Sequence, residues 1–190
     1  MTIITAIHDA GQNLTFLGSN GRATIGSFVA PSRDTKWFAK NGWVIGITGT
    51  GPKLEALKAH EEKFPKDTQH PFEILKFMRV AYGDFDIGEM DEGLKRYCGS
   101  GLLIHKSGAI WDFDNSFCLT EVERGVFWAR GSGIDVALGA ALALREYIQS
   151  PNALTKRVLE IVIANDVDCP GELLIQTFDQ NGDLSDPLEV

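Results

Sequence analysis

Two short apolar segments near the N-terminus, residues 2–7 (TIITAI) and 14–19 (LTFLGS), limit the possible folds more than any other part of this chain. They flank HDAGQN, whose glycine and asparagine favour a tight turn, so the two segments are predicted to pair as an antiparallel hairpin. Residues 43–49 (WVIGITG) predict a third strand, which is apolar on both faces and therefore expected to be covered on both. The chain thus begins with strands that need other layers around them.

Helical patterns follow each group of predicted strands. Pro52 suits the first turn of a helix that carries apolar residues up to Phe64, because a missing N–H costs nothing there, and residues 71–82 supply a second apolar stripe. The second half repeats this order, with hairpins at 101–105/109–114 and 117–122/125–131, helices at 133–150 and 155–164, and a last strand at 171–178. The longer of these two helices is predicted to stop at Pro151.

These elements predict an α+β fold. Two groups of antiparallel strands and two pairs of helices are best satisfied by two stacked antiparallel sheets between two helical layers, an αββα four-layer sandwich. The chain has 190 residues, of which 44% are hydrophobic and 23% charged. This length and composition suit one globular domain spanning residues 1–190.

Charge and cysteine content argue against several functions. The net charge is −8 and no Lys/Arg block occurs, which disfavours binding to nucleic acid or to an anionic membrane surface. No apolar stretch reaches the roughly 20 residues of a spanning helix, so we expect no membrane contact and a cytoplasmic location. Cys98, Cys118 and Cys169 show no CxxC spacing, which argues against disulfides and zinc, and we expect neither a metal nor a cofactor.

The second residue raises a chemical possibility. Removal of Met1 would leave Thr2 with its hydroxyl and a free α-amine, a nucleophile and a base on one residue. An α-amine has a pKa of about 7.7–8.0, against about 10.4 for a lysine, so it is the better base at neutral pH. On position alone, Thr2 is better explained as the first residue of an edge strand.

Further motifs follow in an order that resembles one known family. They are NGRATIG (20–26) after the first hairpin, Lys36 in DTKWF, TGTGP (48–52) at a strand end, GSG (131–133) before a long helix, and Asp166 in NDVDCPG. Together they resemble the proteasome β-subunit group, including the bacterial HslV-type peptidases, from Thr2 to about Phe178. The resemblance implies an N-terminal-nucleophile hydrolase on the αββα sandwich.

The same resemblance implies a threonine peptidase site. Thr2 would attack through its hydroxyl and use its amine as general base, while the ammonium of Lys36 would favour the neutral amine and stabilise the alkoxide. Backbone N–H groups at Gly49 and Thr50 would receive the oxyanion. Glycine at this strand end lets a substrate approach the backbone closely.

Ser132 and Asp166 would orient the nucleophile in this scheme. Each supporting residue also has a purely structural interpretation: Lys36 as a solvated lysine, Ser132 as the cap of the helix at 133–150, and Asp166 as a turn residue. By resemblance the product would be a self-compartmentalised homo-oligomer, a ring or a spiral, that cleaves unfolded polypeptides delivered by an ATP-driven unfoldase.

Three departures from the family pattern bear on activity. Asn20 stands where active members carry aspartate, Cys169 stands where many have serine, and residues 82–98 have no counterpart. The amide oxygen of Asn20 can accept a hydrogen bond from Lys36 but supplies no charge. We therefore predict an assembled but weak site. The alternatives are a catalytically silent, proteasome-like structural subunit and a hydrolase of small amides on the same scaffold.

Other types of site are less favoured. GSGIDVALG (131–139) has Val136 where a dinucleotide loop needs its third glycine. DQNGD (179–183) begins like a calcium loop but lacks the glutamate that would complete it. The acidic residues within 84–92 fit a solvated loop better than a cation site.

Overall fold

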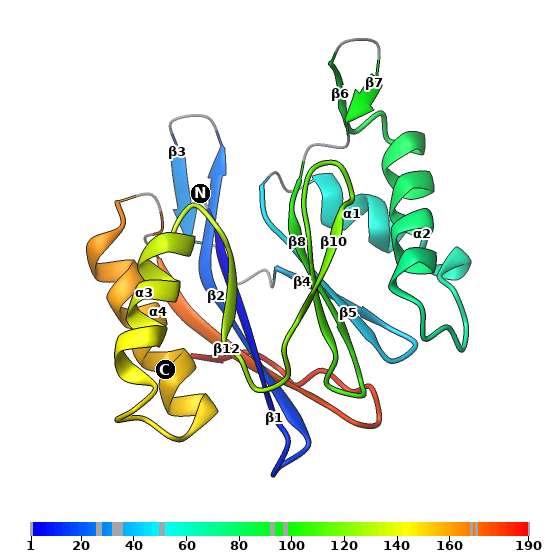
Figure 1. Ribbon diagram of the computed structural model, residues 1–190. Coiled ribbons are helices and arrows are strands. Elements are labelled where there is room, and N and C mark those ends of the chain that lie inside the picture. Colours follow the sequence, from blue (N-terminus) through cyan, green and yellow to red (C-terminus); the bar gives the residue numbers. More distant parts are fainter. Residues whose placement is uncertain are drawn as a thin grey trace.

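The computed structural model describes residues 2–25, 28–31, 36–49, 52–91, 94–96, 99–167, 169 and 171–189. Most strands in these residues belong to two antiparallel sheets, which lie side by side in Figure 1. The predicted Thr50 and the unassigned Cys98 lie outside the described residues, as does Met1.

The first sheet carries the N-terminus. Its strand order is β11-β1-β2-β12-β13, with β3 paired to β2, and the strands are β1 (Ile3–Asp9), β2 (Leu14–Ile25), β3 (Phe28–Pro31), β11 (Trp128–Gly131), β12 (Glu172–Asp179) and β13 (Leu188–Glu189). β1 and β2 pair antiparallel from Asp9 opposite Leu14, so the predicted N-terminal hairpin is confirmed. Asp9 supports the turn because its Oδ1 accepts the N–H groups of Gly11 and Gln12 at 2.8 and 3.2 Å.

The second sheet carries the other predicted strands. Its order is β10-β9-β8-β5-β4, and the strands are β4 (Trp37–Lys40), β5 (Trp43–Ile47), β8 (Gly101–His105), β9 (Ile110–Phe113) and β10 (Leu119–Val122). The short strands β6 (Glu89–Asp91) and β7 (Leu94–Arg96) pair with each other. β5 is buried along its whole length, as its apolar sequence predicted.

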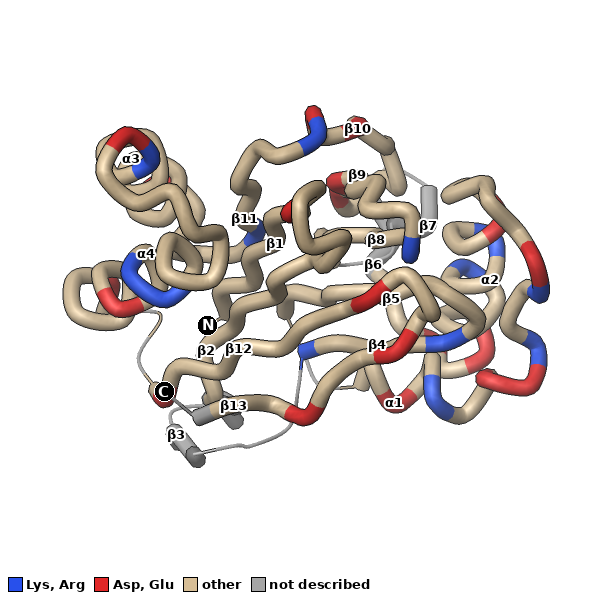
Figure 2. The backbone as a smooth tube through the Cα atoms, turned by 90° about the horizontal axis from the view of Figure 1, so that it is seen from below, with Lys and Arg blue, Asp and Glu red and all other residues tan. Residues whose placement is uncertain are grey.

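Helices cover the outer face of each sheet. α1 (Pro52–Ala59), the short 3-10 helix η1 (Glu61–Lys63) and α2 (Pro71–Asp84) lie beside the second sheet, and α3 (Ile134–Leu144) and α4 (Pro151–Asn165) lie beside the first. Figure 2 shows the two helical pairs on opposite sides of the molecule with both sheets between them. The predicted αββα four-layer sandwich is therefore confirmed.

The alternation of side chains along β1 connects the layers. Ile3 and Ile7 pack in the core between the first sheet and α3 and α4, whereas Ile4 and Ala6 belong to the core between the two sheets. A third core lies between the second sheet and α1 and α2. Apolar residues on both faces of β1 thus hold the start of the chain between two buried layers.

The second predicted hairpin of the C-terminal half is wrong. Residues 117–122 and 125–131 were expected to pair, but β10 pairs with β9 in the second sheet and β11 pairs with β1 in the first. The chain changes sheets through an exposed segment at 123–126. The two sheets are tied together here, since the guanidinium of Arg130 donates to both carboxylate oxygens of Asp112 at 2.5 and 2.6 Å.

The predicted helix boundaries also need correction. α1 ends at Ala59, before the predicted limit, and α3 ends at Leu144, whose carbonyl accepts the N–H groups of Tyr147 and Ile148, both at 2.9 Å. Pro151 is the first residue of α4 and not the stop of the preceding helix, because proline suits a first helical turn as well as it terminates a helix. None of the helices in the described part of the chain has the length and hydrophobicity that crossing a bilayer requires.

Candidate active site

Thr2 directly precedes β1, and the backbone of Ser132 and Gly131 packs closely against its carbonyl group. Its side chain is 7% exposed, and its carbonyl oxygen accepts the N–H of Ser132 at 3.1 Å. Gly131 has a φ of +122°, and a Cβ there would lie 1.8 Å from the Thr2 carbonyl oxygen, so only glycine fits. Continuing the alternation of Ile4 backwards places the Thr2 side chain on the face of the first sheet that looks toward the second.

Asn20 holds the residue that follows the candidate nucleophile. It is fully buried in β2, opposite Leu173 of β12, and its Oδ1 accepts the N–H of Ile3 at 3.0 Å. A side chain thus satisfies a backbone donor that would otherwise be unpaired and buried. The predicted hydrogen bond between Asn20 and Lys36 stays a prediction.

The side chains of Ser132, Asp166 and Cys169 gather around the backbone of Gly133. Ser132 lies between β11 and α3, and the other two lie between α4 and β12. The Oγ of Ser132 lies 3.1 Å from the Sγ of Cys169. A Cβ at Gly133 would lie 3.0 Å from Asp166 Oδ2 and 3.1 Å from Cys169 Sγ, so the carboxylate and the thiol sit against the same peptide. Because the N–H of Ser132 is also hydrogen-bonded to the carbonyl of Thr2, the structure brings Thr2, Ser132 and Asp166 into one region. The roles expected of Ser132 and Asp166 in orienting Thr2 stay predictions.

The structure contradicts the structural interpretation of Ser132 and agrees with that of Asp166. The residue before α3 is Gly133, and no side chain caps that helix, so Ser132 is not its cap. Asp166 directly follows α4, and its N–H closes the helix on Val162 at 2.8 Å. The Asp166 carbonyl then accepts the N–H of Cys169 at 3.0 Å, and this turn presents the carboxylate to Gly133.

Cys169 contributes a neutral thiol to this cluster. Burial raises its pKa, and the negative charge of Asp166 raises it further, while hydrogen bonds from the Ser132 side chain and the Gly133 backbone oppose the shift. A protonated, fully buried thiol is a poor nucleophile. Cys169 therefore serves here as a hydrogen-bond partner of Ser132.

Lys36 and Gly49 approach from the second sheet. The carbonyl of Lys36 accepts the N–H of Ile47 at 3.1 Å, which places Lys36 beside the end of β5. The next residue, Trp37, belongs to the same inter-sheet core as Ile4. The expected contact of Lys36 with Thr2 stays a prediction. Gly49 is exposed with a φ of +99°, and within the described residues its N–H has no acceptor.

Sequence reasoning missed Lys53, the second residue of α1. Its side chain is only 3% exposed, and its Nζ donates to the carbonyl of Thr48 at 3.4 Å. One signal could have revealed it. A lysine in the first turn of a helix opposes the helix dipole, so its presence there calls for a compensating contact.

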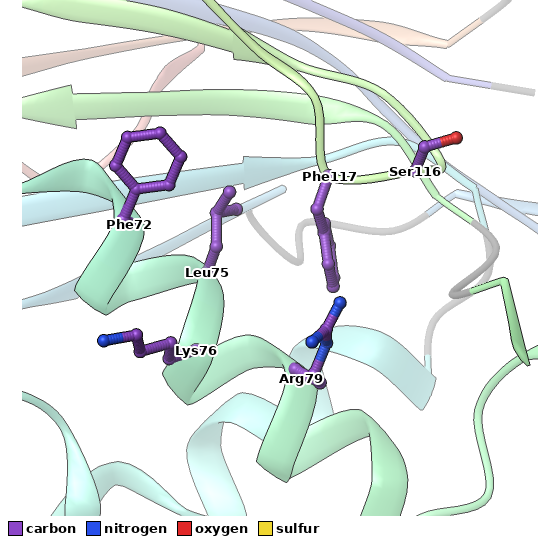
Figure 3. A pocket seen from close by; sticks show the side chains of 6 residues that line it. All are labelled: Phe72, Leu75, Lys76, Arg79, Ser116 and Phe117. Atoms are coloured by element: carbon purple, nitrogen blue, oxygen red, sulfur yellow. The ribbon is translucent and has the colours of Figure 1, made fainter.

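Other parts of the molecule offer weaker candidates. In the residues that the structure describes, no group of three or more His, Cys, Asp or Glu side chains could hold a metal ion. A pocket of about 180 Å³ lies between α2 and a turn of the second sheet, and Figure 3 shows Arg79 directed toward Phe117 in its wall. The pocket is lined by Phe72, Leu75, Lys76, Arg79, Ser116 and Phe117. It lies on the helical layer that covers the second sheet.

Comparison with known proteins identifies the fold. No protein-family model matches the chain, and no curated protein sequence does. A structure of Thiobacillus denitrificans BPH matches with a TM-score of 0.77 at 15% identity, covering 96% of this chain and all 100% of that one. The structure of T. denitrificans BPH in complex with epoxomicin matches with a TM-score of 0.75 at 14% identity, covering 94% and 98%.

A eukaryotic HslV from Trypanosoma brucei matches with a TM-score of 0.64 at 18% identity, covering 93% of this chain and 99% of that one. These matches extend over nearly the whole chain, and the described strands and helices form the same layers that the sequence motifs implied. The chain therefore has the αββα sandwich fold of the proteasome β-subunit and HslV group.

Proposed function

We propose that this chain is a threonine-type endopeptidase subunit of a self-compartmentalised, proteasome-like assembly, with Thr2 as nucleophile after removal of Met1. The observation that carries the proposal is the setting of Thr2. The carbonyl of Thr2 accepts a hydrogen bond from the N–H of Ser132, and the N–H of the next residue, Ile3, donates to Asn20. The alternation along β1 puts the Thr2 side chain on the face toward the second sheet. An ordinary edge-strand threonine would not need this many fixed contacts from distant parts of the chain.

The reaction follows from one residue that carries both a hydroxyl and an amine. The Thr2 hydroxyl attacks the carbonyl carbon of the scissile peptide bond while the α-amine accepts the hydroxyl proton. The amine then gives this proton to the leaving nitrogen, and water hydrolyses the resulting ester by the reverse use of the same base. An α-amine suits this role because its ordinary pKa of about 7.7–8.0 is close to neutral pH.

The other residues act on the charges that develop during this reaction. Gly49 is an exposed residue whose N–H has no acceptor among the described residues, and in the proposal this N–H receives the oxyanion of the tetrahedral intermediate, a contact worth about 10²–10³ in rate in other hydrolases. Lys36 would favour the neutral amine and stabilise the alkoxide, and Asp166 with Ser132 would hold Thr2 in place. These three roles are proposals that rest on the same arrangement.

Assembly is part of the proposal. An active threonine open to the cytoplasm would endanger other proteins, so we propose that identical subunits enclose it in a ring or spiral, fed with unfolded polypeptides by an ATP-driven unfoldase. Large apolar side chains on the outer helices support docking, since Leu142 of α3 is 62% and Phe72 of α2 58% exposed. Light scattering at micromolar concentration should give a mass many times 20.8 kDa, and a monomer would contradict this part.

One observation favours a second candidate, a catalytically silent subunit of such an assembly. The position expected to carry a catalytic carboxylate holds the neutral amide of Asn20, whose oxygen is engaged by the backbone of Ile3. A residue with this contact could be retained for the stability of the first sheet alone. The experiment below separates the two candidates.

The test begins with the intact mass of protein purified from cells, which should lack one methionine residue. The protein is then incubated with epoxomicin, the compound seen in the T. denitrificans BPH structure, and with fluorogenic peptides. We expect one adduct per chain on Thr2 and slow peptide cleavage. Thr2→Ala should abolish both, Thr2→Ser should retain part of each, and the exposed strand residue changed in Thr120→Ala should change neither.

Two results would overturn the peptidase proposal. One is a mature protein that retains Met1, since the free amine would then be missing. The other is a correctly processed protein that neither cleaves peptides nor gains the mass of the inhibitor, in which case the silent-subunit candidate replaces the peptidase.

A further inference from the structure

Lys53 occupies an unusual position for a lysine. It is buried in the first turn of α1, although a cation there opposes the helix dipole. Lys58 of the same helix behaves as expected for a surface residue, since it is exposed and paired with Glu55 at 2.9 Å. Lys53 instead lies on the buried face of α1 with Ala56 and Leu57, so its charged amine needs a polar partner there.

Two glycines make room for the lysine side chain. A Cβ at Gly49 would lie 2.8 Å from Lys53 Nζ, and a Cβ at Gly99 would lie 2.6 Å from Nζ and 3.0 Å from Cε. The amine thus lies against two stretches of bare backbone, one at the end of β5 and one before β8. Between them it reaches the carbonyl oxygen of Thr48, to which it donates at 3.4 Å.

Lys53 contacts the peptide group between Thr48 and Gly49, whose N–H is the candidate oxyanion donor. The carbonyl of Thr48 and the N–H of Gly49 belong to one planar peptide unit and point in opposite directions. Fixing the carbonyl on Lys53 therefore fixes the direction of the N–H. A donor on the carbonyl oxygen also polarises the unit and makes its N–H a stronger hydrogen-bond donor.

The preceding residue is held from the other side. The N–H of Thr48 donates to the carbonyl of Ser100 at 2.9 Å, and its Oγ1 donates to the same oxygen at 2.8 Å. Hydrogen bonds to Ser100 and from Lys53 thus hold Thr48 from two sides. The N–H of Gly49 has no acceptor in the described part of the chain. A rigid peptide with one available N–H is what an oxyanion site requires.

We propose that Lys53 is the positioning residue of the oxyanion site, which it orients through the peptide between Thr48 and Gly49. The inference rests on the peptidase function proposed above. It differs from the role proposed for Lys36, because Lys53 acts on the oxyanion donor and not on the nucleophile.

The first test separates kcat from KM. Lys53→Met keeps the length and volume of the side chain and removes the donor, and Lys58→Met is the matched control on the same helix. Because the oxyanion exists only in the transition state, kcat should fall about ten- to a hundredfold in Lys53→Met while KM stays within about twofold. Lys58→Met should leave both constants unchanged. An unchanged kcat in Lys53→Met, with active wild type, would overturn the inference and leave the peptidase proposal intact.

A second variant covers the case in which Lys53→Met does not fold. Gly99→Ala places a Cβ where the amine now lies and displaces the lysine, but the φ of +155° at Gly99 also strains any side chain there, so unfolding in urea must first show that the variant folds. This variant should show the same loss in kcat with little change in KM. Full activity in Gly99→Ala would count against the inference.

A readout independent of activity keeps the inference testable if the wild type proves silent. Hydrogen exchange of the Thr48 amide, which is bonded to Ser100, reports how firmly the clamped peptide is held. In Lys53→Met this amide should exchange at least about tenfold faster, while amides in the middle of β5 keep their protection. Equal exchange of the Thr48 amide in wild type and variant would show that Lys53 does not position this peptide.

Discussion

Replacement of Asn20 by aspartate tests the chemistry of the site most directly. In the wild type the Asn20 amide oxygen accepts the N–H of Ile3 at 3.0 Å in a fully buried setting. Asn20→Asp keeps this acceptor and the size of the side chain, and adds the negative charge that the family resemblance associates with activity. Any change in rate therefore reports the charge together with the loss of the amide N–H donors, and not a change in the size of the side chain.

Three free-energy terms set the expected change in rate: a stronger hydrogen bond and the attraction to an ammonium are favourable, and the burial of a carboxylate is unfavourable. A hydrogen bond to a neutral acceptor is worth about 0.5–1.5 kcal/mol, and one to a charged acceptor about 1.5–3 kcal/mol. Burying a carboxylate costs several kcal/mol. Attraction to an ammonium about 4 Å away, the role proposed for Lys36, returns about 4 kcal/mol at an effective dielectric constant of 20. If about 1.4 kcal/mol of the remainder stabilises the transition state, kcat/KM rises about tenfold.

The assay compares initial rates of peptide cleavage and of inhibitor labelling for the wild type, Asn20→Asp and Asn20→Leu. The leucine variant has a similar size but no acceptor, so the buried N–H of Ile3 loses its partner and the free energy of unfolding in urea should fall by about 1–3 kcal/mol. Peptide mass spectra must first show that the wild-type amide is intact, because its hydrolysis at the Asn20-Gly21 sequence would create the same aspartate.

An activity of Asn20→Asp equal to or below that of the wild type would refute this reasoning. It would mean that Asn20 does not act on the lysine and that its function ends with the backbone of Ile3. If Asn20→Asp restores cleavage to an otherwise inert protein, the natural chain is a silent subunit whose site lacks only this charge.

Two further predictions follow from the structure. Gly131→Ala should displace the backbone of Thr2, since the new Cβ would lie 1.8 Å from the Thr2 carbonyl oxygen, and should therefore abolish inhibitor labelling. Gly139→Ala is the matched control, because Gly139 lies inside α3 and its new Cβ would have no atom within 4 Å. This control should raise the free energy of unfolding in urea by about 0.5–1 kcal/mol. Burial lowers the pKa of His8 and of His105 from 6.5, so the unfolded chain binds more protons than the folded chain in this pH range. The free energy of unfolding should therefore decrease as the pH falls from about 6.5 through the lower pKa values of the folded state. The decrease should be smaller in a His8→Gln, His105→Gln double variant.

Sequence patterns that act over a few residues predicted the structure well. The hairpin of β1 and β2 could be recognised because turn residues separate two apolar segments, and both determinants are local. Local signals failed where one residue has two uses. Pro151 begins α4, although proline after a long helical pattern also suits a stop, and only the N-cap contact of Ser150, whose Oγ accepts the N–H of Ala153 at 3.4 Å, distinguishes these cases.

Strand partners were harder to predict than strands. Of the predicted strand at 125–131, residues 128–131 form β11, but they pair with β1 and not with residues 117–122. Both pairings satisfy the same local pattern. The choice depends on which sheet offers a buried edge, and Ala129 of β11 packs in the core beneath α3 and α4. Such a preference arises only when the layers are assembled.

Local patterns along the chain were enough to predict the layers and to identify Thr2 as a residue able to combine a hydroxyl with a free amine. The surroundings of Thr2 depend instead on packing between distant segments. Hydrogen bonds join segments that are remote along the chain, from Ser132 to the Thr2 backbone and from Ile3 to Asn20. The burial of Lys53 likewise depends on segments distant from α1. Contacts of this kind depend on how the sheets and helices pack and not on neighbouring residues, so no local pattern can specify them.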